Sequence, residues 1–209
     1  MPAARELLLD AAWAALARRP WSAVRMVDVA ASAGVSRQTL YNEFGGKDGL
    51  ARALVRRAAD GYLAGVERAL TGPAEPSDRL TATAEWTAAA ARDDALVRAL
   101  LTGCWHEWLP APPFTAAPAG SPVPAQRRAD SALPAPPDFV RIVRDRAASA
   151  LTGPGAAPAD TARLLRACEL VVRLALSCVA APPAEGGIAD LVRAVLPRDL
   201  VRPDPNARP

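Results

Sequence analysis

The chain has 209 residues and a formal net charge of +3, and 51% of its residues are hydrophobic. A chain of this length can bury a substantial core in one or two domains. Its three cysteines follow no disulfide or ligand spacing, its start does not resemble a signal peptide, and no uncharged apolar run is long enough to span a membrane. We therefore expect a cytoplasmic protein without membrane partners.

Nearly all of the chain is predicted to be helical, with about nine helices and no convincing strand. The first helix, over residues 3–18, ends before Pro20 and has one apolar face, formed by Leu8, Ala11, Ala12, Ala15 and Leu16. Residues 1–58 contain nine basic and five acidic side chains, whereas the rest of the chain is slightly acidic. A basic excess in one part of a chain is typical of nucleic-acid binding.

Residues 27–47 predict two short helices joined by a tight turn, the arrangement of a helix-turn-helix unit. Gly34 stands where the first helix must stop, because glycine adopts the left-handed conformation without a Cβ clash. Ser36 is suited to cap the second helix, since its hydroxyl can accept a hydrogen bond from a free backbone N–H. Leu40 and Phe44 are four residues apart and should point inward together. The second helix is therefore predicted to enter the DNA major groove.

The outward side of this second helix carries side chains that suit contacts with DNA. Arg37 can read guanine through two hydrogen bonds, Gln38 can read adenine, and Thr39 can contact a thymine methyl group or a phosphate. Tyr41 suits a phosphate contact by its type, and Asn42 lies beside Gln38. These side chains indicate a surface that both reads bases and holds the backbone.

Lys47 is the only lysine among 25 basic residues. It begins the next predicted helix, where free backbone N–H groups and the helix dipole also favour a phosphate. A solvated surface lysine is the alternative, and the neighbouring motif favours the phosphate contact.

The stretch from Met26 to Leu50, with the helix before it, resembles the DNA-binding domain of TetR-type (tetracycline-repressor family) transcription regulators. The matching motifs are Asp28-Val29-Ala30, Ala33-Gly34-Val35-Ser36, Thr39-Leu40-Tyr41, Phe44 and Lys47-Asp48-Gly49-Leu50. The resemblance implies a helix-turn-helix domain over residues 1–46. The family's DNA contacts carry over to Arg37, Gln38, Thr39, Tyr41, Asn42 and Lys47, and we add Arg25 and Ser36 as candidates.

Two positions depart from the family's pattern. Where the family often has a threonine that caps the helix before the turn, this chain has Arg25, which loses the cap but can still reach a phosphate. Where the family often has a histidine before the conserved phenylalanine, this chain has Glu43. Because phosphates repel a carboxylate, we expect Glu43 to accept a hydrogen bond from a base, to pair with Arg37 or Lys47, or to point away.

Residues 47–209 are predicted to form a helical ligand-binding and dimerisation domain. Helices are expected over residues 47–70, 77–92, 95–108, 138–151, 159–181 and 188–196. A long Pro- and Ala-rich loop is expected over residues 109–137, which contain nine of the 21 prolines. Gly61 and Gly65 weaken the first of these helices, and either close packing of a neighbouring helix or a hinge explains them.

The segment Cys104-Trp105-His106-Glu107-Trp108 is the richest cluster of side chains outside the N-terminal part. Aromatic walls with a few polar groups are typical of a pocket for a lipophilic ligand, and ordinary tryptophan packing is the alternative. The candidate ligand-binding residues are Tyr62, Trp86, Leu101, Cys104, Trp105 and Trp108. The spacing of Cys104 and His106 is not that of a zinc site, and we expect neither a metal nor a cofactor.

The helix predicted over residues 159–181 is apolar on two faces, which indicates burial on two sides. A central core helix in a monomer or a two-fold interface with a second subunit explains this pattern. The resemblance favours the homodimer, because TetR-type proteins pair their last two long helices into a four-helix bundle. The candidate dimerisation residues are Leu164, Cys168, Val171, Val172, Ala175, Val179, Leu191 and Val195.

Together these features predict an all-α, homodimeric, ligand-responsive transcription regulator. We expect a repressor that a small lipophilic effector releases from a pseudo-palindromic operator in double-stranded DNA. Two alternatives are a small all-α binding protein or enzyme with a degenerate helix-turn-helix, and a constitutive DNA-binding protein without a ligand. A single histidine, the lack of a phosphate-binding loop and the lack of a recognisable nucleophile–His–carboxylate spacing give no support for catalysis.

Overall fold

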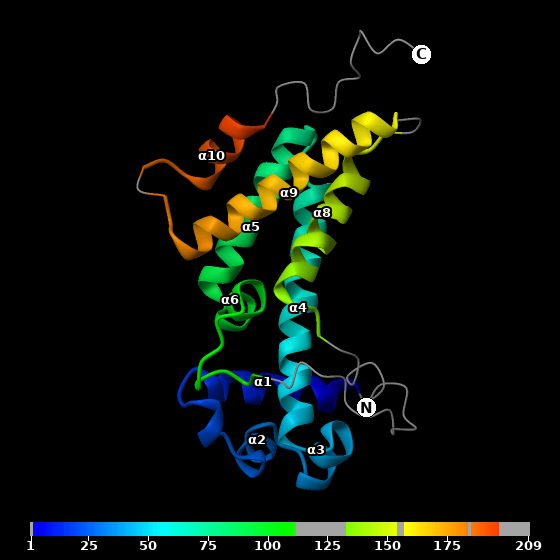
Figure 1. Ribbon diagram of the computed structural model, residues 1–209. Coiled ribbons are helices and arrows are strands. Elements are labelled where there is room, and N and C mark those ends of the chain that lie inside the picture. Colours follow the sequence, from blue (N-terminus) through cyan, green and yellow to red (C-terminus); the bar gives the residue numbers. More distant parts are fainter. Residues whose placement is uncertain (1, 112–132, 154–156, 184, 197–209) are drawn as a thin grey trace. The chain divides into compact units, whose positions relative to one another are not determined.

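The computed structural model describes residues 2–111, 133–153, 157–183 and 185–196. Within these ranges the regular elements are nine α-helices and one short 3-10 helix, η1 (Trp21–Ala23), without a strand (Figure 1). The predicted all-α fold is therefore confirmed. The helices divide into two compact units, one of Met1–Asp60 with Cys104–Pro134 and one of Gly61–Gly103 with Ala135–Pro209.

The first unit contains α1 (Pro2–Leu16), α2 (Met26–Ser32), α3 (Arg37–Phe44) and the N-terminal half of α4 (Lys47–Thr71). α1 contacts both α2 and α3, and α2 contacts α3. One side chain from each of the four helices is at most 1% exposed: Leu8, Val29, Leu40 and Leu50. This shared apolar core fixes the orientation of α3, the helix that the sequence predicts to read DNA.

The second unit contains the rest of α4, α5 (Pro76–Asp93), α6 (Ala95–Thr102), α8 (Pro136–Leu151), α9 (Pro158–Ala180) and α10 (Ile188–Val195). α9 packs against α5 and α8, and α10 packs against α5 (Figure 1). The most deeply buried side chains of the second unit come from α5, α6, α8, α9 and α10. They include Leu80, Leu96, Phe139, Cys168 and Val192. No helix in the described part of the chain is long and apolar enough to cross a membrane.

Two predicted boundaries are wrong. The helix expected over residues 95–108 ends at Thr102, because Gly103 adopts the left-handed conformation with φ of 75° and donates its N–H to the Ala99 carbonyl. Pro136 and Pro137, which fall in the loop expected over residues 109–137, instead begin α8. Proline suits this place because the first N–H groups of a helix have no partner within the helix. Residues 112–132 of the expected loop lie outside the described residues.

The two compact units divide within α4, after Asp60, whereas the sequence suggested a domain boundary after residue 46. Leu50 and Leu54, at 0% and 1% exposure, lie in the half of α4 that belongs to the first unit. A helix that contributes to two units cannot show a boundary in its own sequence, because its apolar positions continue without a break.

Candidate DNA-binding surface

The turn between α2 and α3 closes with the hydrogen bonds of a Schellman motif. The Val35 N–H bonds to the Ala30 carbonyl at 3.1 Å, and the Gly34 N–H bonds to the Ala31 carbonyl at 3.2 Å. Gly34 has φ of 67°, as the sequence predicted for a residue that must stop a helix. The turn therefore holds the two helices at a fixed junction without the help of long side chains.

Ser36 caps α3 as predicted. Its Oγ accepts a hydrogen bond from the Thr39 N–H at 3.0 Å, and the two hydroxyl oxygens lie 2.8 Å apart. The Thr39 hydroxyl is thus oriented by Ser36 before any DNA arrives. At the other end, Gly45 adopts the left-handed conformation and donates its N–H to the Tyr41 carbonyl.

The outer face of α3 presents the predicted DNA-reading side chains together. Arg37, Gln38, Tyr41 and Asn42 are all exposed, with Tyr41 at 42%, whereas Leu40 and Phe44 are buried on the opposite face. Gln38 Nε2 donates a hydrogen bond to Asn42 Oδ1 at 2.8 Å, which aligns the two amides one helical turn apart. The face therefore offers a guanidinium, two amides and a phenol on one rigid helix.

Lys47 lies at the start of α4 and is only partly exposed. Its Nζ donates a hydrogen bond to the Ser22 carbonyl at 3.0 Å and lies 5.3 Å from the centre of the Trp21 ring. Partial burial lowers the pKa of Lys47, and the neighbouring Asp48 opposes this shift. The ammonium group has three donors, so the bond to Ser22 positions it and leaves two for a phosphate.

Arg25 precedes α2 and forms no side-chain cap, as expected. Its guanidinium instead makes two hydrogen bonds of 3.0 Å to the Asp28 carboxylate, which Arg19 also contacts at 3.3 Å. The Arg25 hydrogen bond lowers the pKa of Asp28, with a smaller contribution from Arg19. A phosphate contact by Arg25 therefore has to share the guanidinium with Asp28.

Glu43 pairs with a residue that the sequence did not single out. Arg5 of α1 lies 3.7 Å from its carboxylate, donates a hydrogen bond to its backbone carbonyl at 3.3 Å, and stacks 4.7 Å above the Phe44 ring. Arg5 is a partner that the sequence did not offer for Glu43, which was expected to accept from a base, to pair with Arg37 or Lys47, or to point away. The negative charge is thereby balanced from within the domain, at the end of α3 that α1 covers.

Gly49 is a packing position that the helical pattern did not reveal. A Cβ atom at this residue would collide with the Phe44 carbonyl oxygen and carbon, because the first turn of α4 runs directly against the end of α3. The signal in the sequence was a glycine inside the first turn of a helix, where glycine costs stability. Gly49 therefore allows α3 to lie against α4.

The residues predicted to bind a ligand are divided between the two compact units. Tyr62, Trp86 and Leu101 belong to the second unit, whereas Cys104, Trp105 and Trp108 belong to the first. The last three follow the end of α6, since Gly103 terminates that helix, and Cys104 and Trp108 are exposed. The helix expected over residues 95–108 therefore does not include these three residues.

Trp86 and Tyr62 are fixed by close packing. Trp86 Nε1 donates a hydrogen bond to the Tyr62 carbonyl at 3.0 Å, and its ring lies so close to Gly65 that a Cβ there would overlap it. Close packing thus explains Gly65, whereas the space beside Gly61 is open. Tyr62 is 2% exposed, and its hydroxyl shares a hydrogen bond with the Thr87 hydroxyl, which also bonds to the Thr83 carbonyl.

We expect Thr87→Val to lower the free energy of unfolding by about 1–3 kcal/mol, because the Tyr62 hydroxyl would stay buried without a partner. Tyr62→Phe is the matched variant and should cost less, since Thr87 keeps its bond to the Thr83 carbonyl. Chemical unfolding of both variants checks the order. An equal loss for the two would show that the shared hydrogen bond is not what stabilises this contact.

The buried contact between Tyr62 and Thr87 also makes the free energy of unfolding depend on pH. Burial raises the pKa of Tyr62 to about 12 from its usual 10.0, and the hydrogen bond with Thr87 opposes the shift. The folded chain thus keeps a proton that the unfolded chain loses, so this stabilisation is complete below pH 10 and falls between pH 10 and 12. Unfolding measured across this range should show a shallower decline for Tyr62→Phe.

The predicted dimerisation face of α9 is buried within its own chain. Five residues on it are at most 5% exposed: Leu164, Cys168, Val171, Val172 and Ala175. Within one chain, α5 and α8 pack against α9 and cover that face. Val179 is half-buried, and Leu191 and Val195 of α10 are 36% and 42% exposed. Leu170, on the other side of α9, is 49% exposed.

Comparison with known proteins relates the first unit to bacterial transcription regulators. Residues 8–54 match the family model for bacterial regulatory proteins of the tetR family. The chain is 47% identical over 66 residues to the HTH-type transcriptional regulator AlkX of Mycobacterium tuberculosis. That alignment covers 32% of this chain and 31% of AlkX, so it spans about a third of the curated relative.

Two solved structures resemble the chain over most of its length. A tetR-family transcriptional regulator from Streptomyces coelicolor aligns with a TM-score of 0.50 and 22% identity, over 93% of this chain and 77% of that one. This likeness supports a shared fold. The TetR family repressor AlkX from Dietzia sp., implicated in biodegradation of n-alkanes, aligns with a TM-score of 0.46 and 23% identity, over 91% and 92% of the two chains.

Proposed function

We propose that this chain, which carries the DNA-binding domain of the tetR family of bacterial regulatory proteins, regulates transcription by binding an operator in double-stranded DNA. The observation that carries the proposal is the outer face of α3, where Arg37, Gln38, Tyr41 and Asn42 are exposed together on a helix whose other face is buried. In this proposal α3 enters the major groove, Arg37 and Gln38 contact base edges, and Tyr41 and Lys47 hold phosphates.

The regulator acts as a homodimer in this proposal. A two-fold dimer places two recognition helices in successive major grooves about 34–36 Å apart, which matches a pseudo-palindromic operator. The apolar side chains available for a partner are Leu170 of α9 and Leu191 and Val195 of α10, since the opposite face of α9 is buried. Leu191 and Val195 belong to the set predicted from the sequence, and Leu170 is added to them.

Replacing Leu170 with glutamate should shift the monomer–dimer equilibrium toward the monomer by roughly tenfold or more, because an anchor in a two-fold interface acts twice. Leu7→Glu is the matched control, since Leu7 is 50% exposed but lies on α1. Sedimentation over a range of protein concentrations measures both variants. Equal dissociation for the two, or an unchanged dimer in Leu170→Glu, would place the interface elsewhere.

In this proposal the regulator also responds to a small ligand. In this proposal the dimer has two conformations, and only one of them fits the operator. A small lipophilic effector that binds the second unit more tightly in one conformation than in the other shifts the two populations. A few kcal/mol of differential binding is enough. We propose repression relieved by the effector, in the cytoplasm, where the operator lies. The close packing of Trp86 against Gly65 favours, as a second candidate, constitutive binding without an effector.

Selection of tight-binding duplexes from a random DNA library tests the proposal whatever the base sequence of the operator. We expect an inverted repeat whose half-sites lie one helical turn apart, and an affinity that falls steeply as salt rises. Failure to enrich any sequence at low salt would reject DNA binding as the function. Enrichment of a single half-site would keep α3 as the reading helix and reject the dimer.

A further inference from the structure

A cavity of about 700 Å³ opens between α5, α6, the C-terminal end of α9 and the segment that leads into α10. It lies entirely within the second unit. Its volume is in the range of pockets that hold small organic ligands. None of the residues that the sequence suggested for ligand binding lines it.

The inner wall of the cavity is apolar. Four alanines in a row on α5, residues 88–91, leave room because their side chains are short, and three of them line the cavity. The opposite wall is formed by the end of α9 and by the segment that follows it, with Cys178, Val179, Pro182, Pro183 and Ile188. Such a wall suits a hydrocarbon or an aromatic ring, since it offers no polar side chain to hydrogen-bond.

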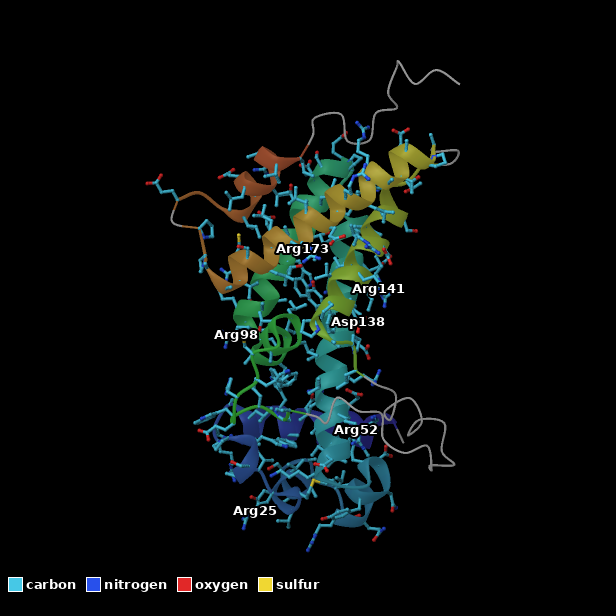
Figure 2. The ribbon with its side chains drawn as sticks, in the orientation of Figure 1. Arg25, Arg52, Arg98, Asp138, Arg141 and Arg173 are labelled. Atoms are coloured by element: carbon cyan, nitrogen blue, oxygen red, sulfur yellow. The ribbon has the colours of Figure 1, made fainter. Side chains whose placement is uncertain are left out.

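The charged residues of the cavity are two arginines and one glutamate. Arg92 comes from the last turn of α5, Arg98 from α6 (Figure 2), and Glu85 lies seven residues before Arg92 on α5. Within the part of the chain that the structure describes, no ion pair engages either guanidinium, in contrast to Arg57 with Asp10 or Arg173 with Glu169. The lining is therefore positive by one charge.

The backbone at the rim does not compete for an anion. Gly187 precedes α10, and its N–H bonds to the Asp190 carboxylate at 3.3 Å, so a carboxylate of the chain itself already lies at the start of that helix. Recognition of a negative group consequently falls to Arg92 and Arg98, whose planar guanidinium groups match a carboxylate.

We infer that this cavity binds an amphipathic monoanion, a small organic carboxylate whose hydrocarbon body lies against the alanine and α9 walls and whose carboxylate is held by Arg92 and Arg98. Charge complementarity selects this occupant, because the lining carries one net positive charge and two unpaired donor groups of the kind that bind carboxylates. The inference does not rest on DNA binding, and it assigns to the second unit a site away from Tyr62 and Trp86.

Cys178 offers a direct readout of occupancy. It lines the cavity and is 8% exposed, whereas Cys104 is exposed in the first unit and Cys168 is 0% exposed. Iodoacetamide labelling followed by peptide mass spectrometry gives a rate for each thiol in the full chain. Octanoate, octan-1-ol and octylamine serve as probes, because they share one hydrocarbon chain and differ in the charge of the head group.

We expect octanoate to slow the labelling of Cys178 at a lower concentration than octan-1-ol does, and octylamine to be the weakest. Cys104 should label at the same rate throughout. The double variant Arg92→Gln/Arg98→Gln should raise the octanoate concentration needed for half-protection by roughly tenfold and leave that for octan-1-ol unchanged. Arg141→Gln is the control, since this arginine is exposed on α8, pairs with Asp138 and does not line the cavity.

Filling the cavity separates binding from a general effect on the thiol. Ala88→Phe should abolish protection by octanoate and by octan-1-ol alike. The inference is overturned if octanoate does not protect Cys178, if the double arginine variant is protected as well as the original chain, or if the three probes act equally. It is also overturned if protection rises with protein concentration alone, because a second copy of the chain then covers the cavity. Operator binding, measured in parallel, shows whether the first unit works independently of this result.

Discussion

Arg37→Ala is expected to weaken binding to the selected operator by about 1–3 kcal/mol, roughly 5- to 150-fold, and to relax the preference for guanine at one position of each half-site. Arg37 is exposed at the start of α3, and no ion pair engages it in the described part of the chain, so its guanidinium is free to reach a base edge. Tyr41→Ala should weaken binding to all sequences nearly equally, as expected for a phosphate contact.

The control for this pair is Arg141→Ala, which removes an exposed arginine from α8. It should leave both affinity and sequence preference unchanged, while a titration in salt reports how many phosphate contacts each variant has lost. If Arg37→Ala bound the operator as tightly as the original chain, α3 would not be the reading helix. If it lost affinity without any change in preference, Arg37 would contact the backbone.

Gly49→Ala should destabilise the first unit by about 1–3 kcal/mol or more, because the new Cβ would overlap the backbone carbonyl of Phe44 and the two helices would have to separate. A backbone atom cannot rotate away as the end of a flexible side chain can. Since α3 ends at Phe44, the same displacement should reduce operator binding, even though Gly49 is not proposed to touch DNA. Hydrogen exchange of residues 37–60 measures the local opening directly.

Gly61→Ala is the matched control on the same helix. Nothing lies within 4 Å of a Cβ at Gly61, so alanine should stabilise α4 by up to about 1 kcal/mol through its higher helix propensity. Opposite signs for the two substitutions would establish that the contact with α3 explains Gly49. If Gly49→Ala were as harmless as Gly61→Ala, the close approach between α3 and α4 would not matter for stability.

Prediction of the helix ends from the sequence was most accurate where a short local pattern determines the backbone conformation. Gly34 and Ser36 define the end of one helix and the start of the next through their own conformations and hydrogen bonds, so their neighbours in the chain contain nearly all of the information. The starts and ends of most longer helices also agree within one or two residues. The exception was α6, because Gly103 stops it while the apolar spacing continues through Trp105 and Trp108.

Partners far apart in the chain were not predictable in this way. Glu43 contacts Arg5, which lies 38 residues earlier, and the sequence offered Arg37 and Lys47 only because they were near. Gly49 appeared in the sequence only as part of a family motif, and its reason is the close approach of the Phe44 backbone. Both cases depend on how one helix lies against another, which no local pattern specifies.

The sequence by itself determined that the described chain is helical, that its N-terminal part contains a helix-turn-helix unit and that α3 exposes the side chains proposed to read DNA, since helix periodicity and capping act over a few residues. Only the tertiary structure decided which apolar face of α9 is covered and where a cavity remains. An apolar face reads the same in a sequence whether its own chain or a partner covers it. The physical reason is that the hydrophobic effect is non-directional, so burial depends on packing between distant helices.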